Sequence, residues 1–312
     1  MAKKILITGG AGFIGSNLAK IFSKKNFSVA ILDDFSSGRE IFVPPNCEIF
    51  RGDVADQNFV KNIFKKFQPQ IVSHHAAHVS VRASAENPIF DAEKNIFGAI
   101  NIFENAGKFG AEKIIFASTG GAMISENEKK FPVREKFPRI LASPYAISKF
   151  SAEKYLQFFA KKFGFCATIF RYANVFGPRQ TPKSEAGVVA IFCEKMLQNC
   201  APKIFGSGRQ RRDFIFIDDI CAANLLATEK NFPGIFNLGT GREISVLQIF
   251  EKIAAKINFS KKPIFAKKND GELFRASLDS QKFRKISGWR SKINFENGLQ
   301  KTIFWWKNFL KK

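Results

Sequence analysis

The sequence predicts an α/β protein built on a doubly wound parallel sheet, followed by a smaller, mixed α/β lobe. Short apolar runs occur near residues 3–8, 28–32, 47–51, 70–74, 112–118 and 165–171. Helical patterns at about 56–67, 89–109 and 144–163 lie between them, and a glycine-rich turn follows the first run. Strands that alternate with helices are typical of a parallel sheet covered on both faces.

The turn after the first strand has the pattern of a dinucleotide site. Gly9, Gly12 and Gly15 would let the turn close, admit a pyrophosphate against backbone N–H groups, and pack the helix on the strand. The second strand ends at Asp33, which would accept hydrogen bonds from ribose hydroxyls and favours NAD. Arg39 nearby leaves the phosphorylated cofactor open. This first part is therefore predicted to be a Rossmann-type domain.

Residues at the ends of the next strands are expected to face the same cofactor, because the carboxyl ends of parallel strands meet at one edge of a sheet. Asp53 and Val54 follow the third strand and would meet the adenine. His75, Ala76 and Ala77 follow the fourth and would lie along the pyrophosphate.

A metal site has little support in the sequence. All three histidines, His74, His75 and His78, lie in one segment, but no carboxylate or cysteine accompanies them nearby. The five cysteines are scattered and form no Cys-x-x-Cys pair. They are interpreted as small core residues in a reducing compartment, so we expect neither metal nor disulfide.

A tyrosine and a lysine lie four residues apart at the start of a predicted helix. Pro144 suits the first helical turn, and Ser143 suits the N-cap. The spacing places Tyr145 and Lys149 on one helix face, where the ammonium could lower the pKa of the phenol. Lowering that pKa from about 10 to about 7 takes roughly 4 kcal/mol. An exposed, solvated pair is the alternative interpretation of the same spacing.

The pattern is less regular after residue 171. Helices are expected near 187–198 and 219–230, the second capped by Asp218 and Asp219, and at 296–310. Residues 235–239 resemble a strand returning to the sheet. We therefore expect an NAD-binding domain at 1–171, joined by a returning segment near 213–240, and a smaller C-terminal lobe within 172–312.

The chain of 312 residues carries a formal charge of +22, which could indicate a nucleic-acid partner. The lysines are dispersed along apolar-periodic segments, so we interpret them as solvated surface and expect no nucleic acid. No window of about 18 apolar residues occurs, and no signal-peptide pattern follows Met1. These features predict a soluble, cytoplasmic protein without a membrane partner.

Nine motifs along the whole chain together resemble one known family. They are Gly9-Gly-Ala-Gly-Phe-Ile-Gly15, Asp33-Asp-Phe-Ser-Ser-Gly38, Gly52-Asp-Val, His75-Ala-Ala, Asn95-Ile-Phe-Gly98, Ser118-Thr-Gly-Gly-Ala122, Ser143-Pro-Tyr-Ala-Ile-Ser-Lys149, Arg171-Tyr-Ala-Asn-Val-Phe-Gly-Pro-Arg-Gln180 and Arg212-Asp-Phe-Ile-Phe-Ile-Asp-Asp219. The chain is similar to the NAD-dependent epimerases and dehydratases of the extended short-chain dehydrogenase/reductase superfamily. Within that family it most resembles the UDP-glucose 4-epimerases.

The resemblance implies NAD that is reduced and reoxidised within one turnover of a UDP-sugar. Tyr145 would remove the proton from the sugar O4 while hydride leaves C4, and the 4-keto sugar would turn over before hydride returns. Lys149 would assist, and Thr119, Ser118 or a water molecule would supply the second hydroxyl at O4.

The resemblance also implies the remaining contacts. The cofactor residues implied are Gly9, Gly12, Phe13, Ile14, Gly15, Asp33, Asp34, Ser36, Ser37, Gly38, Asp53, Val54, His75, Ala76, Ala77, Asn95, Ser118, Tyr145, Lys149 and Ala173. The substrate residues implied are Asn174, Gly187, Val188, Ile204, Phe205, Arg212, Glu272 and Ala276. A homodimer through the helices near 89–109 and 144–163 is implied as well.

The sequence departs from the epimerase pattern at three places. Gly120 stands where many epimerases have the catalytic serine, and Ile124-Ser125 replaces a usual Tyr-Gly. The late Arg-Pro-Gly-Asp-like clamp appears as Asn269-Asp270-Gly271-Glu272, without its arginine. Ala276 is small enough to leave room for an N-acetyl group, so N-acetylated sugars stay open as substrates.

Three alternative functions remain at this stage. Nucleotide-sugar 4,6-dehydratases and UDP-glucuronate decarboxylases share the fold and the first hydride step, but they usually carry acidic residues where this chain has Gly120 and Gly121. A non-catalytic NAD-binding or RNA-binding protein would also keep the fold. The intact Tyr145 and Lys149 favour catalysis.

Overall fold

The computed structural model describes residues 2–125, 127–137, 139–182, 187–268 and 273–311. The chain divides into two compact units. The first unit contains Met1–Ala122, Leu141–Arg171 and Cys221–Phe236, and the second contains Met123–Ile140, Tyr172–Ile220 and Asn237–Lys312.

Within the described residues, the first unit is built on a seven-stranded sheet that confirms the predicted doubly wound fold. The strand pairs from β3 to β5 are all parallel. In spatial order the strands are β10 (Gly234–Leu238), β6 (Cys166–Tyr172), β5 (Lys113–Thr119), β4 (Ile71–His74), β1 (Lys4–Thr8), β2 (Ser28–Asp33) and β3 (Glu48–Arg51). Strand β10 is the returning segment that the sequence predicts, and it lies at the sheet edge beside β6.

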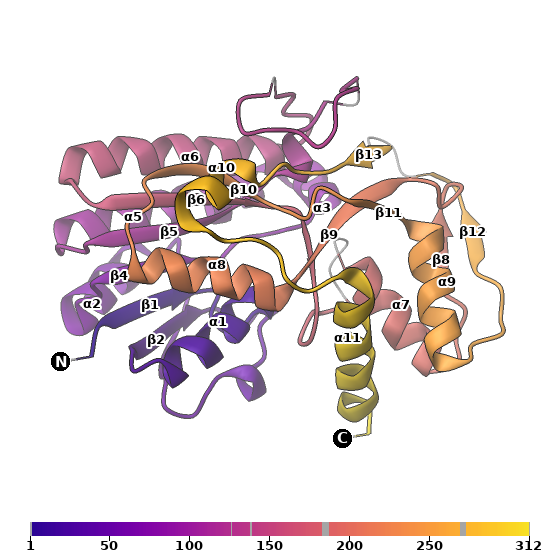
Figure 1. Ribbon diagram of the computed structural model, residues 1–312. Helices are drawn as coiled ribbons and strands as arrows, with labels where there is room; N and C mark the ends of the chain where they lie inside the picture. Colours follow the sequence, from indigo (N-terminus) through magenta and orange to yellow (C-terminus); the bar gives the residue numbers. More distant parts are fainter. Residues whose placement is uncertain (1, 126, 138, 183–186, 269–272, 312) are drawn as a thin grey trace. The chain divides into compact units, whose positions relative to one another are not determined.

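Helices cover this sheet on both faces (Figure 1). The helices concerned are α1 (Phe13–Lys24), α2 (Gln57–Phe67), α5 (Gly98–Lys108) and α6 (Pro144–Phe163). Buried side chains of α2, α5 and α6 form one apolar cluster with Leu6, Leu32 and Ile114 of the strands. The alternate strand residues Ile5 and Ile7 are also buried, as expected for strands enclosed on both sides.

The segment before α5 departs from the single helix predicted at 89–109. It consists of α3 (Val81–Glu86), α4 (Pro88–Ala92) and a π-helical turn at Glu93–Phe97 that leads directly into α5. Ser80 caps α3 by accepting a hydrogen bond from the N–H of Ala83. Single π turns inside α-helices are frequent at functional sites.

The second unit contains smaller sheets within its described residues. Strand β9 (Arg211–Phe216) lies at the centre of one, paired with β7 (Asn174–Phe176), β11 (Glu243–Ser245) and β13 (Arg275–Ala276). Strands β8 (Lys203–Phe205) and β12 (Ile264–Ala266) form a separate pair. The helices are α7 (Val188–Leu197), α9 (Val246–Ile257), α10 (Gln281–Ser287) and α11 (Phe295–Phe309). Helix α8 (Ile217–Glu229) begins in this unit, with Asp218 and Asp219 in its first turn instead of before it.

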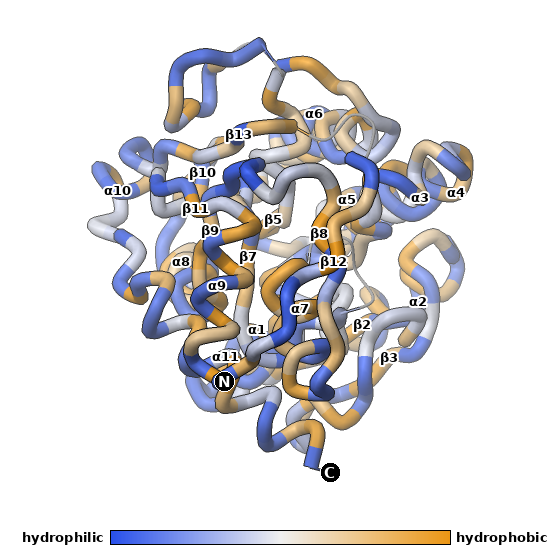
Figure 2. The backbone as a smooth tube through the Cα atoms, turned by 90° about the vertical axis from the view of Figure 1, so that its right-hand side faces the viewer, coloured by the Kyte–Doolittle hydropathy of each residue, from blue (hydrophilic) through white to orange (hydrophobic). Residues whose placement is uncertain are grey.

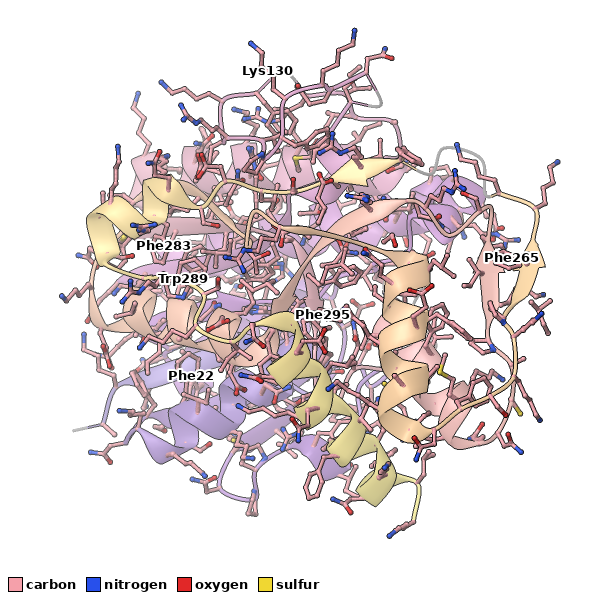
Figure 3. All side chains as sticks on the ribbon, turned by 45° about the vertical axis from the view of Figure 1, so that its right-hand side comes forward. Phe22, Lys130, Phe265, Phe283, Trp289 and Phe295 are labelled. Atoms are coloured by element: carbon pink, nitrogen blue, oxygen red, sulfur yellow. The ribbon has the colours of Figure 1, made fainter. Side chains whose placement is uncertain are left out.

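Aromatic side chains fill the core of the second unit. Phe295 of α11 lies 5.0 Å from Phe176, measured between ring centroids, and Phe283 lies 5.8 Å from Trp289. Figure 3 labels Phe283, Trp289 and Phe295. Hydrophobic and hydrophilic residues alternate along α9 (Figure 2), whose buried face includes Phe250. These aromatic contacts place Phe176 of β7 and Phe295 of α11 in the core beside β9.

Throughout the part of the chain that the structure describes, every helix is too short or too polar to cross a bilayer.

Candidate active site

The glycine turn joins β1 to α1 so closely that side chains are excluded. Gly9 has φ +65°, in the left-handed region that favours glycine. A Cβ on Gly15 would lie 2.1 Å from the carbonyl oxygen of Gly9, and one on Gly9 would lie 2.8 Å from the nitrogen of Ala76. Helix α1 begins at Phe13, directly after this turn, so its first N–H groups and its positive dipole end lie at the turn.

Asp33 ends β2 and is anchored to the same turn. Its Oδ2 accepts a hydrogen bond from the N–H of Ala11 at 2.9 Å, and its Oδ1 accepts one from the N–H of Phe35 at 2.8 Å. Burial raises the pKa of the carboxyl above its ordinary value, and these N–H groups oppose the shift. Asp34 accepts hydrogen bonds from both the N–H and the hydroxyl of Ser36. The predicted ribose-binding acid therefore lies against the glycine turn.

The carboxyl ends of β3 and β4 bring the next predicted cofactor residues together. Asp53 forms an ion pair with Lys94, and Val54 is buried. The N–H of Ala76 donates to the Thr8 hydroxyl at 3.1 Å, which ties the end of β4 to the end of β1. Ala77 follows directly.

Burial favours the neutral form of two histidines of this segment, His74 and His75. Burial lowers the pKa of His75 to about 4 and that of His74 well below its ordinary value. His74 Nδ1 lies 2.7 Å from the Thr8 hydroxyl, and His75 Nδ1 lies 3.3 Å from the Ser73 hydroxyl. No cluster of metal-ligating side chains occurs among the described residues.

Helix α6 presents Tyr145 and Lys149 from its first two turns. Its N-terminus is fixed by two serines: the Ser143 hydroxyl accepts from the N–H of Ala146 at 3.2 Å, and the Ser84 hydroxyl of α3 accepts from the N–H of Tyr145 at 3.1 Å. Lys149 is buried, with its Nζ 4.4 Å from the centroid of the Phe116 ring. The hydrogen-bonded N-terminal part of α6 thus carries both functional groups.

The pKa values of this pair are set mainly by burial. Burial and the nearby Asp91 carboxylate raise the pKa of the Tyr145 phenol, while a hydrogen bond with the Thr119 side chain lowers it. Burial lowers the pKa of Lys149 to about 8, against the effects of Glu153 and Asp91. The helical spacing predicts that Lys149 lowers the pKa of the phenol, whereas in the structure the groups around Tyr145 raise it.

The two hydroxyls of the Ser-Thr motif have different partners. Ser118 is buried and donates to Glu153 Oε1 at 2.6 Å. Thr119, the next residue along β5, points to the other face of the strand and bonds with Tyr145. Of these two hydroxyls, that of Thr119 is the one in contact with the phenol.

Asn95 lies in the π-helical turn with its amide bound on both sides. It donates to the carbonyl of His78 at 2.9 Å and to Asp91 Oδ1 at 2.8 Å, and it accepts from the N–H of His78 at 2.9 Å. This predicted cofactor residue therefore fixes the segment after β4.

The predicted substrate residues in the second unit lie on β7, β8, β9, β13 and α7. Arg212 and Ala276 are direct register partners on β9 and β13. Gly187 is the N-cap of α7, which begins at Val188, and Ala173 directly precedes Asn174, the first residue of β7. Ile204 is buried on β8, whereas Phe205 is exposed. Glu272 and the clamp Asn269–Glu272 lie outside the described residues.

Ile124, which replaces a usual tyrosine, is buried in an apolar cluster of the second unit. Its partners there are Val133, Ala276 and Leu278. Ile124 therefore lies in the same cluster as Ala276, the residue that the sequence predicts to leave room for an N-acetyl group.

Sequence reasoning missed five polar residues around the Tyr145 and Lys149 pair: Ser84, Asp91, Ser148, Glu153 and Arg171. Ser148 and Glu153 share the buried face of α6 with Lys149. A signal was present, because Tyr145, Lys149 and Glu153 follow one another at intervals of four residues, and polar residues repeated on one helix face can form a polar network.

Comparison with known proteins agrees with this geometry. Residues 5–239 match the NAD dependent epimerase/dehydratase family. The chain is 41% identical over 305 residues to a putative UDP-glucose 4-epimerase of Methanocaldococcus jannaschii, covering 97% of this chain and 98% of that protein.

Solved structures give the same result. A UDP-glucose 4-epimerase from Thermotoga maritima with UDP-glucose matches with a TM-score of 0.96 and 40% identity, covering 98% of this chain and 99% of the other. One from Thermus thermophilus, in complex with NAD, matches with a TM-score of 0.91 and 36% identity, covering 97% and 99%.

The glycine turn, Asp33 and the Tyr145 and Lys149 pair on a doubly wound sheet define an NAD-binding protein of the short-chain dehydrogenase/reductase type. The chain belongs to the NAD-dependent epimerase/dehydratase family, which confirms the resemblance stated from its motifs. NAD is accordingly its cofactor, and the closely packed glycines provide the cradle that a dinucleotide needs.

Proposed function

We propose that the protein is an NAD-dependent 4-epimerase of a nucleotide sugar of the UDP-glucose and UDP-galactose type. One observation carries the proposal: the Tyr145 phenol is hydrogen-bonded to Thr119 on β5 and lies one helical turn from the buried Lys149. A base, a cation and a second hydroxyl are the groups that proton removal from a sugar hydroxyl requires.

Each group has one role in the proposed reaction. Tyr145 in the phenolate form takes the proton from O4, and the Thr119 hydroxyl hydrogen-bonds to the same oxygen. Lys149, as an ammonium, stabilises the phenolate. NAD, held by the glycine turn and Asp33, would supply the redox chemistry at C4 of the sugar, as acceptor and then donor of one hydride. Reprotonation of O4 by Tyr145 completes the turnover without any other proton donor.

The rest of the proposed binding residues fall into two groups. In the first unit, the glycine turn, Asp33 and the segment Asp53–Val54 would hold NAD. In the second unit, Arg212 would bind the pyrophosphate through its planar guanidinium, and Asn174 would bind a phosphate. Val188 and Phe205 would contact the uracil.

Two related reactions are less well supported by the residues beside Thr119. Dehydration at C5 and C6 requires an added acid and base, but Gly120 and Gly121 follow Thr119. The buried carboxylate of Asp91 is already bound by Ser148 and Asn95, and that of Glu153 by Ser118 and Arg171. Return of hydride to the same carbon is therefore the simplest outcome.

We also propose that the protein forms a homodimer through α4 to α6. Exposed apolar side chains occur on these helices, namely Ile89, Phe97, Ile147, Tyr155 and Phe158. Phe97 and Phe158 are 62% and 59% exposed, and apolar side chains that gather on one surface mark a site of protein–protein contact.

The test is incubation of the purified protein with UDP-galactose without added NAD, followed by identification of the product by NMR. We expect UDP-glucose. A panel of UDP- and dTDP-sugars, including N-acetylated ones, then defines the substrate. A 4-keto-6-deoxy product or released carbon dioxide would instead indicate one of the related reactions.

Two tyrosines of the same helix allow a matched pair of variants. Tyr145→Phe is expected to lower turnover by about 10²-fold or more while bound NAD is retained, because the base is lost. Tyr155→Phe removes a hydroxyl from the 42% exposed side chain of Tyr155 and should leave turnover unchanged. Near-normal turnover of the Tyr145→Phe variant would remove Tyr145 from the mechanism.

A further inference from the structure

A buried carboxylate lies next to the proposed catalytic pair without belonging to it. Asp91, on α4, has no exposed surface. Its Oδ2 accepts a hydrogen bond from the Ser148 hydroxyl at 2.6 Å, and its Oδ1 accepts one from the Asn95 amide at 2.8 Å. Burial of a carboxylate is costly even when it is hydrogen-bonded, so a negative charge at this position calls for a physical reason.

The hydrogen bonds of Asp91 connect the elements on which the pair depends. Ser148 lies between Tyr145 and Lys149 on α6, and Asn95 belongs to the π-helical turn. Asn95 in turn holds the backbone of His78 after β4. Asp91 therefore links α6 to the segment expected to lie along the cofactor.

The charge of Asp91 acts on both members of the pair. Burial is the main reason why the pKa of Tyr145 is raised, and the Asp91 carboxylate adds to the increase. Burial lowers the pKa of Lys149 to about 8, and Glu153 and then Asp91 oppose that decrease. A buried lysine without neighbouring acids would lose its proton more readily still.

Of the other titratable neighbours, only Glu153 also opposes the decrease in the pKa of Lys149, and it differs from Asp91 in having a permanently charged partner. His74 at the end of β4 and His75 after it stay neutral at pH 7, because burial lowers the pKa of each ring. Glu153 is shared with Arg171, whose Nη2 lies 2.5 Å from Glu153 Oε2. Among the described residues, Asp91 has no such permanent cation: the ring nitrogen Nδ1 of His78 lies 3.8 Å from its Oδ1.

We propose that Asp91 is a positioning residue for the Tyr145 and Lys149 pair. Its hydrogen bond to Ser148 fixes the helix face that carries both groups, and its charge, together with that of Glu153, favours the ammonium form of Lys149. This inference rests on the proposed function, since it concerns the pH range over which a phenolate and an ammonium coexist. It assigns Asp91 no contact with the sugar or the cofactor.

The test is a substitution that removes the charge of Asp91 and keeps the shape of its side chain. Turnover that needs a phenolate and an ammonium rises with pH through one macroscopic pKa and falls through another. In Asp91→Asn the amide can still form hydrogen bonds with Ser148 and Asn95. Both limbs of the pH profile, the rise and the fall of turnover, should move to lower pH by about one unit, because a neighbouring negative charge has been removed. If turnover falls in Asp91→Asn while both pKa values of its pH profile stay unchanged, the proposal is overturned.

Two control variants separate charge from hydrogen bonding. Ser148→Ala removes the hydrogen bond and keeps the carboxylate, so both limbs should stay within about 0.3 units of the wild type, well below the shift expected from a lost charge. His78→Gln removes the ring whose Nδ1 lies 3.8 Å from Asp91 Oδ1, and it should also leave both pKa values of the profile unchanged. A shift in His78→Gln equal to that in Asp91→Asn would assign the effect to His78 and contradict the proposal. Asp91→Ser provides a second neutral variant if Asp91→Asn does not fold.

A measurement independent of turnover keeps the inference separate from the proposed function. In holoprotein labelled with ¹³Cε-lysine, NMR titration gives the pKa of Lys149, whose signal is the one absent from a Lys149→Arg variant. The pKa should be lower in Asp91→Asn than in the wild type by about one unit. Equal values would overturn the proposal even in an active enzyme. Failure of the wild type to convert any sugar would count against the proposed function alone.

Discussion

Glu153 and Arg171 form an ion pair that has no exposed surface. Glu153 Oε1 accepts from Arg171 Nε at 2.7 Å and from the Ser118 hydroxyl at 2.6 Å. Glu153 lies one turn after Lys149 on α6, and Arg171 lies on β6. The pair joins the helix that carries the functional groups to the sheet.

Removal of this carboxylate should be strongly destabilising. Glu153→Ala leaves the buried Arg171 charge without its carboxylate, so the free energy of unfolding should fall by about 3–5 kcal/mol. Glu86→Ala is the control, because Glu86 forms an exposed ion pair with Arg82 and should cost less than about 1 kcal/mol. Both values come from urea unfolding followed by circular dichroism. Similar losses for the two variants would show that the buried pair adds no more than a surface pair.

The glycine turn gives a second prediction at the scale of single residues. In Gly15→Ala the added methyl group would lie 2.1 Å from the Gly9 carbonyl oxygen, so the turn must open. We expect a loss of about 1–3 kcal/mol in unfolding free energy, the usual cost of overpacking, and less NAD retained after purification. Absorbance of the nucleotide released on denaturation measures the second effect.

Gly121→Ala serves as the control for that experiment. A Cβ on Gly121 meets no atom within 4 Å, so the substitution should change neither stability nor bound NAD by a measurable amount. Full NAD content in Gly15→Ala would mean that the close approach of α1 to the turn is not needed for cofactor binding.

The roles of single residues could be predicted only where a short sequence motif indicates them. Gly15 and Asp33 are recognisable because their spacing from β1 is fixed by the chain itself. The pairings of Glu153 and Asp91 were not predicted, since Arg171 lies on the strand after α6 and Ser148 lies 57 residues along the chain from Asp91. Pairings of that kind depend on packing, and no spacing in the sequence encodes them.

Elements were predictable to within one or two residues where the hydrophobic period and the caps agree. Helix α6 begins at Pro144 and ends at Phe163, as its serine cap and its lysine-rich end indicate. The π-helical turn at Glu93–Phe97 was not predicted, because π turns are rare and no pattern in the sequence distinguished i−5 from i−4 hydrogen bonding within the helix expected at 89–109. That turn nevertheless places Asn95 beside Asp91.

The exposed apolar side chains of α6 lead to a prediction about the proposed dimer. Phe158→Glu places a charge among the apolar side chains of α4 to α6, so the proposed dimer should dissociate, with its dissociation constant raised by about tenfold or more. Size-exclusion chromatography with light scattering measures the mass over a range of concentrations. Phe274→Glu is the control, because Phe274 is equally exposed, at 58%, but belongs to the second unit. A monomeric wild type would contradict the proposed dimer directly.

The net charge of the molecule is large, but many of its lysines lie in ion pairs or on helix surfaces. Lys3, Lys66 and Lys108 each lie within about 3 Å of a glutamate carboxylate on the surface. Lys113 is buried and donates to the carbonyls of Thr228 and Lys230, at the end of α8. Such lysines support the fold or are solvated, and they do not form a continuous stripe in the sequence.

A net charge of +22 should therefore produce only weak, non-specific binding to nucleic acid. With a random single-stranded RNA in 150 mM salt, we expect a dissociation constant above about 10 µM, which falls within the non-specific range. Fluorescence anisotropy measured from 50 to 300 mM salt gives both the affinity and its salt dependence. Nanomolar binding at 150 mM salt would show that the lysines form a specific basic surface. In that case a regulatory function would have to be considered beside the proposed epimerase, and the Tyr145→Phe variant would tell the two apart, because only the enzymatic activity depends on that phenol.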